Sequence, residues 1–259
     1  MKIFRTHNNL PIVVVGDLHF KWKILQENIK ALDLEDIIIF QSGDFGVGFD
    51  LTTDRKIRKE NKRLKIFNEF FEKRSIFLYV IRGNHDNPEF FDGCHNLSHI
   101  IFMQDYDVIQ VGDKKILGIG GALSTDRKEN PNFPDMYGKP HPARIPGRDW
   151  WPGSEMVKYD EKKLNNIKDI DVVITHGAPK FAYPLLAEER LEKWVEYDPE
   201  LLNEAIEERE IQTKIYNKLI ENNDIEYYIY GHYHRHNMTP IDNTMFWCLE
   251  KESFTELRV

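Results

Sequence analysis

The chain has 259 residues, with 35 Lys and Arg against 43 Asp and Glu, and 41% of its residues are hydrophobic. This length lets one large domain, or two at most, bury a core without disulfides, and two cysteines are too few for a disulfide framework or a thiolate metal site. No apolar run approaches the ~20 residues that cross a bilayer, and the apolar stretch near the N-terminus is too short for a signal peptide. We therefore expect a cytoplasmic protein without membrane contact, whose net charge of −8 disfavours broad binding of nucleic acids.

The first half of the chain alternates short apolar runs with amphipathic segments, a pattern that is typical of α/β proteins. A strand over 11–15 is followed by a helix over 22–32, whose apolar residues recur at helical spacing. A strand over 37–40 precedes a long, highly charged helix that starts at Asp54 and ends before Ile76. Further strands are expected over residues 76–81, 100–103, 108–111 and 116–119.

Residues 122–156 break this rhythm, because six prolines are interleaved there with aromatic and charged residues. We expect a Pro/Trp-rich insert that forms a long loop or lid, and such stretches inside a compact domain tend to be functional. Asp198 is expected to cap a later helix, with Pro199 at its first position. The remaining elements are predicted as a helix over 158–167, a strand over 170–175, the capped helix to about 221, a strand over 225–230 and a closing β-hairpin over 245–259. Without an internal repeat or linker, residues 1–259 are expected to form a single domain.

Five of the apolar runs end in clusters of polar side chains. These clusters are Gly16-Asp17-Leu18-His19, Gly43-Asp44, Gly83-Asn84-His85-Asp86, Thr175-His176-Gly177 and Gly231-His232-Tyr233-His234. In open α/β sheets, ligands bind in the crevice beyond the carboxyl ends of the strands. Clusters that lie far apart in the sequence are therefore expected to converge at one place.

Seven residues of these clusters divide into two sets of metal ligands that share one carboxylate. The first set is Asp17, His19, Asp44 and His234, and the second is Asp44, Asn84, His176 and His232. Alternate residues of an extended segment point to the same side, so the Asp-x-His and His-x-His spacings direct both side chains toward a common centre. Carboxylate, amide and imidazole ligands without thiolate suit manganese, iron or zinc. We expect two divalent metal ions, with manganese favoured over iron and zinc.

In this order, the five motifs resemble those of the calcineurin-like metallophosphoesterase superfamily, over residues 12 to about 250. The resemblance implies a four-layer α/β/β/α sandwich with two mixed sheets around a dinuclear metal centre, with all seven positions matching family ligands. It also implies that His85 is a catalytic residue that faces the substrate. A hydroxide held between the metals would attack phosphorus in line, and His85 would act as general acid or stabilise charge. Asp86 would orient an imidazole or cap the turn.

The function implied is hydrolysis of phosphomonoesters, with a phosphorylated small molecule or protein as substrate. A phosphodiesterase or nuclease with the same metal centre is the alternative, and the acidic total charge weighs against long nucleic acids. A non-catalytic binding module of the same fold is the third possibility, which the presence of all seven ligand types and His85 disfavours. The oligomeric state stays open.

The second motif departs from the pattern of the eukaryotic-type serine/threonine phosphatases. Those enzymes continue this motif with Asp-Arg-Gly, whereas this chain continues Asp44 with Phe45-Gly46-Val47-Gly48. A substitute arginine for the phosphate is therefore expected from the insert, where the candidates are Arg127, Arg144 and Arg148. Trp150 and Trp151 would form an aromatic wall for the substrate or a hydrophobic plug that holds the insert in place.

Overall fold

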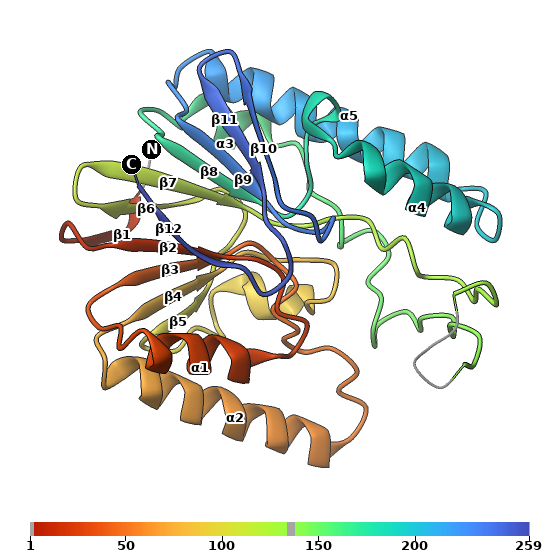
Figure 1. The fold of residues 1–259 in the computed structure, drawn as a ribbon, viewed down its shortest axis with the longest axis horizontal. Helices are drawn as coiled ribbons and strands as arrows, with labels where there is room; N and C mark the ends of the chain where they lie inside the picture. Colours follow the sequence, from red (N-terminus) through yellow and green to blue (C-terminus); the bar gives the residue numbers. More distant parts are fainter. Residues whose placement is uncertain (1–2, 134–137, 259) are drawn as a thin grey trace.

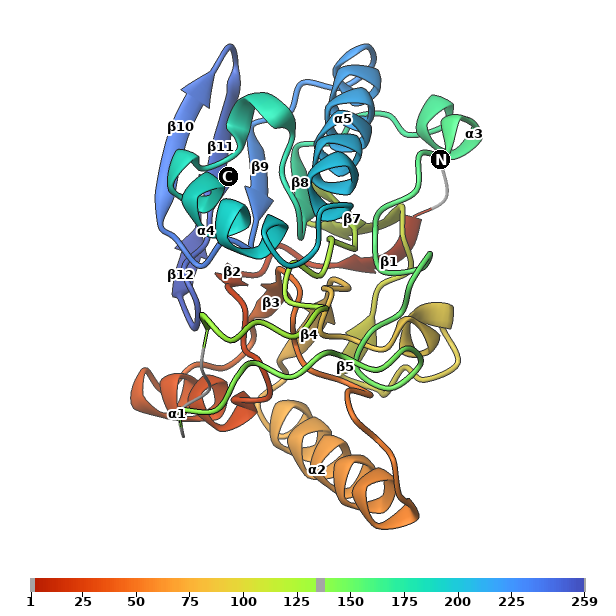
Figure 2. The same cartoon turned by 90° about the vertical axis from the view of Figure 1, so that its right-hand side faces the viewer.

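The computed structural model describes residues 3–133 and 138–258, which form two β-sheets packed face to face. Helices cover the outer face of each sheet, so four layers follow one another (Figure 1, Figure 2). Both sheets combine parallel and antiparallel pairs. The mixed α/β fold with two sheets that the motifs implied is thereby confirmed.

In the described residues, one sheet has five strands and the other has seven. The five-stranded sheet has the order β12 (Phe254–Leu257), β2 (Ile12–Val15), β3 (Ile38–Gln41), β4 (Phe77–Val80) and β5 (Ile100–Phe102). The seven-stranded sheet has the order β1 (Ile3–His7), β6 (Asp107–Val111), β7 (Lys114–Ile119), β8 (Val172–Thr175), β9 (Tyr227–Tyr230), β11 (Thr244–Cys248) and β10 (Asn237–Ile241).

The helices lie in two outer layers, one on each sheet (Figure 1). The five-stranded sheet is covered by α1 (Trp22–Ala31) and α2 (Asp54–Glu72), and the seven-stranded sheet by α3 (Glu161–Asn165), α4 (Leu185–Val195) and α5 (Leu201–Ile220). Short 3-10 turns occupy Pro88–Asp92 and Lys180–Ala182. Among the helices in the described residues, none is both long and apolar enough to span a membrane.

The central core lies between the sheets, because β2, β3 and β8 are buried along their whole length. Strands covered on both faces have continuous apolar runs, and this is why their sequences show no alternation. The residues that meet between the sheets include Val14, Phe40, Tyr79, Ile109, Ile174, Ile229 and Trp247. This packing fixes the two sheets against each other at the edge where the strands end.

The C-terminal hairpin predicted over 245–259 is wrong. In its place β11 pairs with β10 in the seven-stranded sheet, and β12 pairs antiparallel with β2 in the other sheet, with Phe254 opposite Val15. The last two strands therefore belong to different sheets. In the sequence, two apolar runs joined by a short loop look the same whether they form a hairpin or join different sheets. Only the tertiary packing decides which sheet edge each run joins.

Four other elements differ from the sequence prediction. Strand β1 and helix α4 were not expected, and the helix predicted over 158–167 is confined to Glu161–Asn165. Helix α5 begins at Leu201, so the N-cap position falls on Glu200, and the Asp198 carboxylate instead accepts a hydrogen bond from Arg127 Nε. Residues 122–156 contain no helix or strand in their described part, and residues 134–137 of this insert lie outside the described residues.

Helix α5 carries a buried carboxylate beneath the site. Glu208 is 5% exposed and accepts a hydrogen bond from the backbone N–H of Leu123 at 2.6 Å. Burial raises the pKa of Glu208 to about 7, although the Leu123 N–H partly opposes this shift. An acid with a raised folded pKa loses its contribution to stability as the pH rises through that value.

We expect the Glu208→Gln variant to remove this pH dependence. Between about pH 5 and pH 8 the parent should lose up to about 3 kcal/mol of unfolding free energy that the variant keeps, because the amide has no charge to bury. Urea unfolding of both proteins at the two pH values measures the difference. If the unfolding free energies of parent and variant change equally with pH across this range, the raised pKa of Glu208 is contradicted.

Candidate metal centre

The motif strands end at one edge of the molecule, where the two sheets meet (Figure 1). β2, β3 and β4 are parallel neighbours in one sheet, and β8 and β9 are parallel neighbours in the other. Asp17, Asp44 and Asn84 follow the first three strands, and His176 and His232 follow the other two. The packing of the sheets therefore brings together side chains from both halves of the chain.

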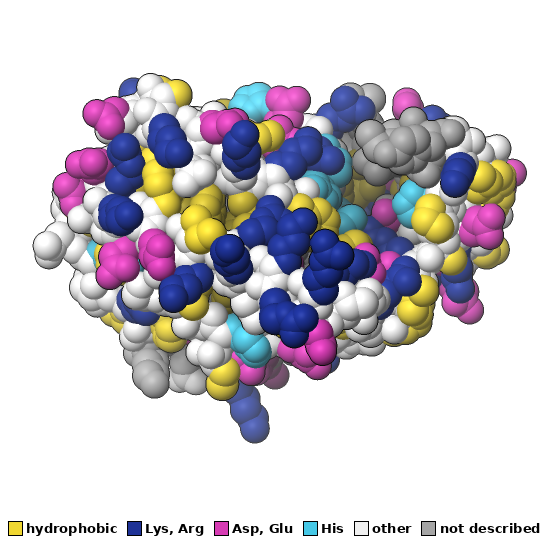
Figure 3. Space-filling model, turned by 90° about the horizontal axis from the view of Figure 1, so that it is seen from below, with side chains coloured by type: hydrophobic (Ala, Val, Ile, Leu, Met, Phe, Trp, Pro, Cys, Tyr) yellow, Lys and Arg dark blue, Asp and Glu magenta, His cyan; other side chains and the backbone are white. Residues whose placement is uncertain are grey.

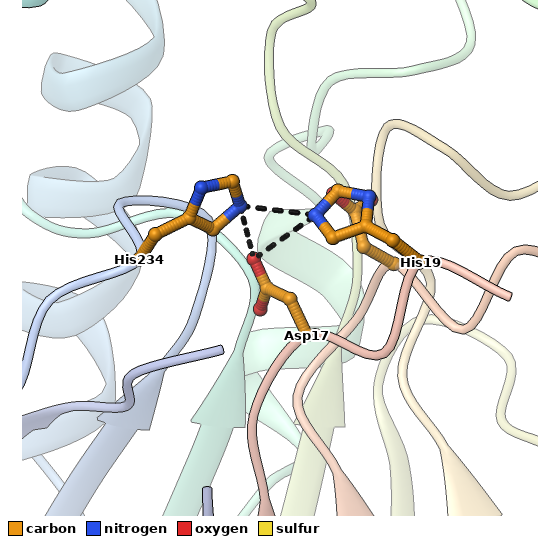
Figure 4. Close-up of side chains that lie close together, drawn as sticks. Asp17, His19 and His234 are labelled. Atoms are coloured by element: carbon orange, nitrogen blue, oxygen red, sulfur yellow. Dashed lines mark hydrogen bonds and ion pairs between the residues drawn. The ribbon is translucent and has the colours of Figure 1, made fainter. Parts of the chain in front are cut away.

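The first predicted set of ligands forms one cluster. Asp17 Oδ2 lies 3.1 Å from His234 Nε2, and this nitrogen lies 3.0 Å from His19 Nε2. His19 Nε2 is also 3.5 Å from Asp44 Oδ2. Figure 4 shows Asp17, His19 and His234 directing these atoms toward one point. One ligand atom from each of the four residues falls within 4.8 Å of the others, which is compact enough to surround a metal ion.

The second predicted set forms a neighbouring cluster on the opposite side of Asp44. His176 Nε2 lies 3.3 Å from Asp44 Oδ1 and 3.2 Å from Asn84 Oδ1. His232 Nδ1 lies 3.0 Å from the same Asn84 oxygen. Asp44 thus directs one carboxylate oxygen toward each cluster, as a bridging ligand does.

The electrostatics of the two clusters favour positive charge between these side chains. Burial alone would raise the pKa of Asp44, but the neighbouring His176 holds it well below its ordinary value. Burial alone would lower the pKa of His176, but Asp44 raises it to about 9. A buried carboxylate that draws protons onto its neighbours attracts cations for the same reason. The oxygen and nitrogen donors, together with this field, fit divalent metal ions.

Backbone hydrogen bonds hold the strand-end loops together. The N–H groups of Leu18 and His19 donate to the Asp44 carbonyl oxygen, and the N–H of His85 donates to Asp44 Oδ1 at 2.7 Å. The N–H of His232 donates to Asp17 Oδ2 at 3.0 Å. Each carboxylate is therefore oriented by the loop of another strand.

Two glycines leave room for these carboxylates. A Cβ on Gly231 would lie 2.1 Å from Asp17 Oδ1, and one on Gly83 would lie 2.2 Å from Asp44 Oδ1. The backbone is also unusual at four of the proposed ligands, since positive φ values that most residues avoid cluster at functional sites. The φ angles are 42° at His19, 57° at Asp44, 67° at His232 and 55° at His234.

Neighbouring polar groups orient two of the ligands. His176 Nδ1 donates to the carbonyl oxygen of Ser42 at 2.7 Å, and this leaves Nε2 directed at the cluster. The Asn84 amide nitrogen donates to Ser124 Oγ at 3.3 Å, so its oxygen faces the histidines. The sequence analysis missed Ser124, because a serine in an irregular insert has no pattern that marks it.

Residues 10–236 match the calcineurin-like phosphoesterase family. The chain belongs to this family. Its members are metal-dependent phosphoric ester hydrolases, which agrees with the enzyme class expected from the motifs. No curated protein sequence matches the chain closely enough to count as a relative.

Three solved structures are distantly similar. A putative 5'-nucleotidase from Staphylococcus aureus has 13% identity and a TM-score of 0.47. The match covers 93% of this chain and 48% of the nucleotidase, so this chain spans about half the length of that protein. A protein serine/threonine phosphatase from Saccharomyces cerevisiae has 11% identity and a TM-score of 0.37, over 96% and 71%. Phosphopantetheinyl hydrolase from Mycobacterium tuberculosis has 13% identity and a TM-score of 0.39, over 96% of each chain.

In this calcineurin-like phosphoesterase, His85 lies beside the clusters. Its Nε2 is 3.9 Å from Asp44 Oδ2, and its ring stacks on Phe49 with centroids 5.2 Å apart. Arg144 Nη2 donates to His85 Nε2 at 2.8 Å and forms an ion pair with Asp126. Burial and then Arg144 lower the pKa of His85 to about 3. The imidazole is therefore neutral, with Nε2 as the acceptor.

Asp126 and Phe49 are site residues that the sequence analysis missed. Burial alone would raise the pKa of Asp126, but Arg144 holds it far below the ordinary range. Asp126 thereby fixes the guanidinium against His85. No spacing rule links a carboxylate at 126 to an arginine at 144, because the connection runs through an irregular insert.

The structure separates the five predicted substrate contacts. Among these five residues, Arg144 is the one that hydrogen-bonds to His85. Arg127 is 4% exposed, is bound by Asp198 and Glu204, and lies over the Trp150 ring at 5.5 Å. These two residues line another cavity, against α5. The expectation that Arg127 holds the phosphate is therefore corrected, since two carboxylates already occupy its guanidinium.

Arg148 and Trp151 also lie outside the cavity at the centre. Arg148 pairs with Asp149 at 2.6 Å and approaches Asp50 at 3.4 Å. Trp151 is 9% exposed and packs on Phe49 at a centroid distance of 6.0 Å, so it acts as the hydrophobic plug and supports the ring that stacks on His85. Neither tryptophan lines the central cavity, since Trp150 lies against Arg127 and Trp151 against Phe49.

Asp86 caps the loops. Its carboxylate accepts hydrogen bonds from the N–H groups of Gly83, Gly46 and Val47 at 2.8, 2.6 and 3.0 Å. This ties the loop after β4 to the loop after β3. Of the two roles considered for Asp86, the structure supports the turn cap.

A cavity of about 280 Å³ opens over the centre. Its floor includes Asp44, Asn84 and His85, and the insert contributes Asp126. The opposite wall comes from α4 and the residues just before it, and from the last motif and the residue after it, with Leu191, Tyr183, Tyr233 and Arg235. The insert and α4 therefore enclose the space directly above the two clusters.

Proposed function

We propose that the chain hydrolyses phosphomonoesters with two divalent metal ions, of which manganese is favoured over iron and zinc. Residues 1–259 would form a single domain. The observation that supports the proposal is the convergence of seven side chains with oxygen or nitrogen donors into two clusters around Asp44. Asp17, His19, Asp44 and His234 would hold one ion, and Asp44, Asn84, His176 and His232 the other. Such a pair of ions supplies an activated water and neutralises charge on the phosphoryl group.

Arg144 and His85 would act on the substrate side of this centre. The guanidinium is suited to binding two phosphoryl oxygens, and Asp126 keeps it in position for them. Contact with a phosphate would draw Arg144 away from His85 Nε2. That nitrogen could then take a proton from water in the cavity and deliver it to the leaving oxygen as general acid.

The substrate is proposed to be a phosphorylated small molecule or protein. The cavity of about 280 Å³ has room for one phosphate ester directly over the clusters. Comparison of p-nitrophenyl phosphate with bis-p-nitrophenyl phosphate, in manganese, iron and zinc, tests the choice of ester. We expect kcat/KM to be at least about tenfold higher for the monoester. A preference for the diester would establish the alternative, a phosphodiesterase.

The three arginines of the insert are expected to behave differently. Arg144→Gln should raise KM for p-nitrophenyl phosphate by about tenfold or more, because it removes the forked contact to phosphate. Arg148→Gln is the matched control and should change neither KM nor kcat. Steady-state kinetics of both variants measures this. Equal effects of the two substitutions would contradict the placement of the phosphate beside Arg144.

Arg127→Gln is expected to act on stability. It leaves the buried carboxylate of Asp198 without its partner, which should cost about 3 kcal/mol of unfolding free energy. Urea unfolding measures this loss, and KM of the folded fraction should stay unchanged. A rise in KM without loss of stability would restore Arg127 as a substrate contact.

A further inference from the structure

The charge of the chain is unevenly distributed over its surface. Although the net charge is −8, the first part of α2 carries basic residues almost without interruption. We call the following exposed residues the basic face of α2: Arg55, Lys56, Arg58, Lys59, Lys62, Arg63 and Lys65. Figure 3 shows Lys and Arg side chains gathered in the middle of the face that is viewed from the side of α1 and α2.

Few carboxylates neutralise this basic face. Lys56 pairs with Asp50 at 2.6 Å, and Arg63 lies over the Trp22 ring at 4.7 Å. The acidic residue within the stretch, Glu60, is 7% exposed and points inward. Within residues 3–133 and 138–258, no carboxylate forms an ion pair with the remaining five, which are Arg55, Arg58, Lys59, Lys62 and Lys65.

The spacing of these charges disfavours the helix itself. Arg55 and Lys59, and likewise Arg58 and Lys62, are four residues apart and therefore repel each other across one turn. The helix is stable because its other side packs Leu64, Phe67 and Phe71 into the core. Basic side chains that repel one another, on a helix that is held in place by core packing, are typical of a surface that binds an anionic partner.

The basic face is attached to the loops of the metal centre. The N–H of Gly48 donates to the Glu60 carboxylate at 2.7 Å, and Arg63 Nη2 donates to the carbonyl oxygen of Phe20 at 3.3 Å. Phe20 directly follows the proposed ligand His19, and its ring meets Phe49 at a centroid distance of 5.3 Å. The two half-buried rings therefore stand between the basic face and the centre.

We propose that the basic face of α2 is a docking surface for single-stranded nucleic acid. From Arg55 to Lys65 the helix extends for about 15 Å, so its side chains can contact several consecutive phosphates. Phe20 lies at the near end of this stripe, where an unpaired base can stack on an aromatic ring. A membrane surface fits less well, because Leu64, Phe67 and Phe71 of α2 are buried and only Ile57 and Ile66 are exposed, which is too little apolar surface to enter lipid. Docking does not depend on the proposed phosphatase function.

The test is binding of a fluorescein-labelled oligothymidylate of ~20 nucleotides, followed by fluorescence anisotropy from about 50 to 300 mM KCl. The test variant carries Arg58→Glu, Lys62→Glu and Lys65→Glu. The matched control carries Lys162→Glu, Lys168→Glu and Lys214→Glu, which change the net charge equally on the other helical layer. These control residues are all exposed.

We expect the parent to bind the strand with an affinity that falls steeply with salt. The test variant should bind at least about tenfold more weakly, and its slope of log K against log salt should be smaller by about 2, since three contacts contribute roughly 0.7 each. The control should stay within about threefold of the parent. Replacement of the same three α2 residues with Gln should weaken binding in the same way. An unchanged far-UV circular dichroism spectrum and an unchanged urea unfolding midpoint show that each variant is folded.

Three results would overturn the docking surface. The first is that the parent does not bind the strand even at the lowest salt concentration. The second is that both triple variants bind the strand equally weakly. The third is that the parent binds duplex DNA, poly-glutamate or phosphatidylserine vesicles more tightly than the strand. Binding and turnover are measured separately, so the two proposals fail separately. Strand binding without turnover of any ester contradicts the proposed function alone, and turnover without strand binding contradicts the docking surface alone.

Discussion

Asp44→Asn is expected to lower kcat/KM by on the order of 10³-fold or more and to reduce the bound metal from about two ions per chain to less than one. The reason is the position of Asp44, which directs one oxygen toward His19 and the other toward His176. An amide presents only one oxygen and no negative charge, so one cluster loses its oxygen donor and both lose the charge that they share. Elemental analysis of protein purified without chelator, together with steady-state kinetics, measures both effects.

Asp50→Asn is the matched control for this variant. Asp50 is also an aspartate of the loop after β3, but it pairs with Lys56 outside the clusters and should leave metal content and turnover unchanged. If Asp44→Asn keeps two ions and full activity, Asp44 is not the shared ligand. A parent protein that holds no metal and cannot be reconstituted would contradict the metal centre as a whole.

His85→Asn is expected to keep both metal ions and lower kcat by about 10²- to 10⁴-fold, the range for loss of a general acid. The contact of residue 85 with Asp44 Oδ1 is made by its backbone N–H, and a substitution preserves that contact. The side chain itself faces Arg144 and the cavity. Metal content and single-turnover rates distinguish a loss of chemistry from a loss of metal.

His95→Asn is a suitable control for His85, because His95 is exposed and pairs only with the nearby Asp92 among the described residues. It should leave the rate unchanged. Loss of a metal ion in His85→Asn would make His85 a ligand, and an unchanged kcat would remove it from the reaction. Either outcome would leave the test of Asp44 unaffected.

The fold and the meeting of the seven ligand candidates could be predicted from the sequence because they depend on local patterns. A buried parallel strand is a continuous apolar run, and the residues after it occupy the edge where ligands bind. Asp17, Asn84 and His176 each follow such a run, so their convergence needs no knowledge of the loops. The partner of β12 could not be predicted, since an apolar run does not specify which sheet edge it joins.

The insert was the least predictable region for a related reason. Arg127, Arg144 and Arg148 have the same chemistry, and nothing in the sequence between them shows which one meets His85. The path of an irregular segment is decided by side chains from other elements, such as Asp198 and Glu204 around Arg127. A loop without periodicity therefore hides its contacts until the whole fold is known.

By itself, the sequence determined the family, the fold and the identity of the metal-ligand candidates, because short motifs after apolar runs specify them locally. The tertiary structure decided which arginine lies at the centre and how the net charge of −8 is distributed. A net charge is a sum over residues, whereas the field at a surface depends on distances that only folding creates. The basic face of α2 on an acidic chain follows from this difference.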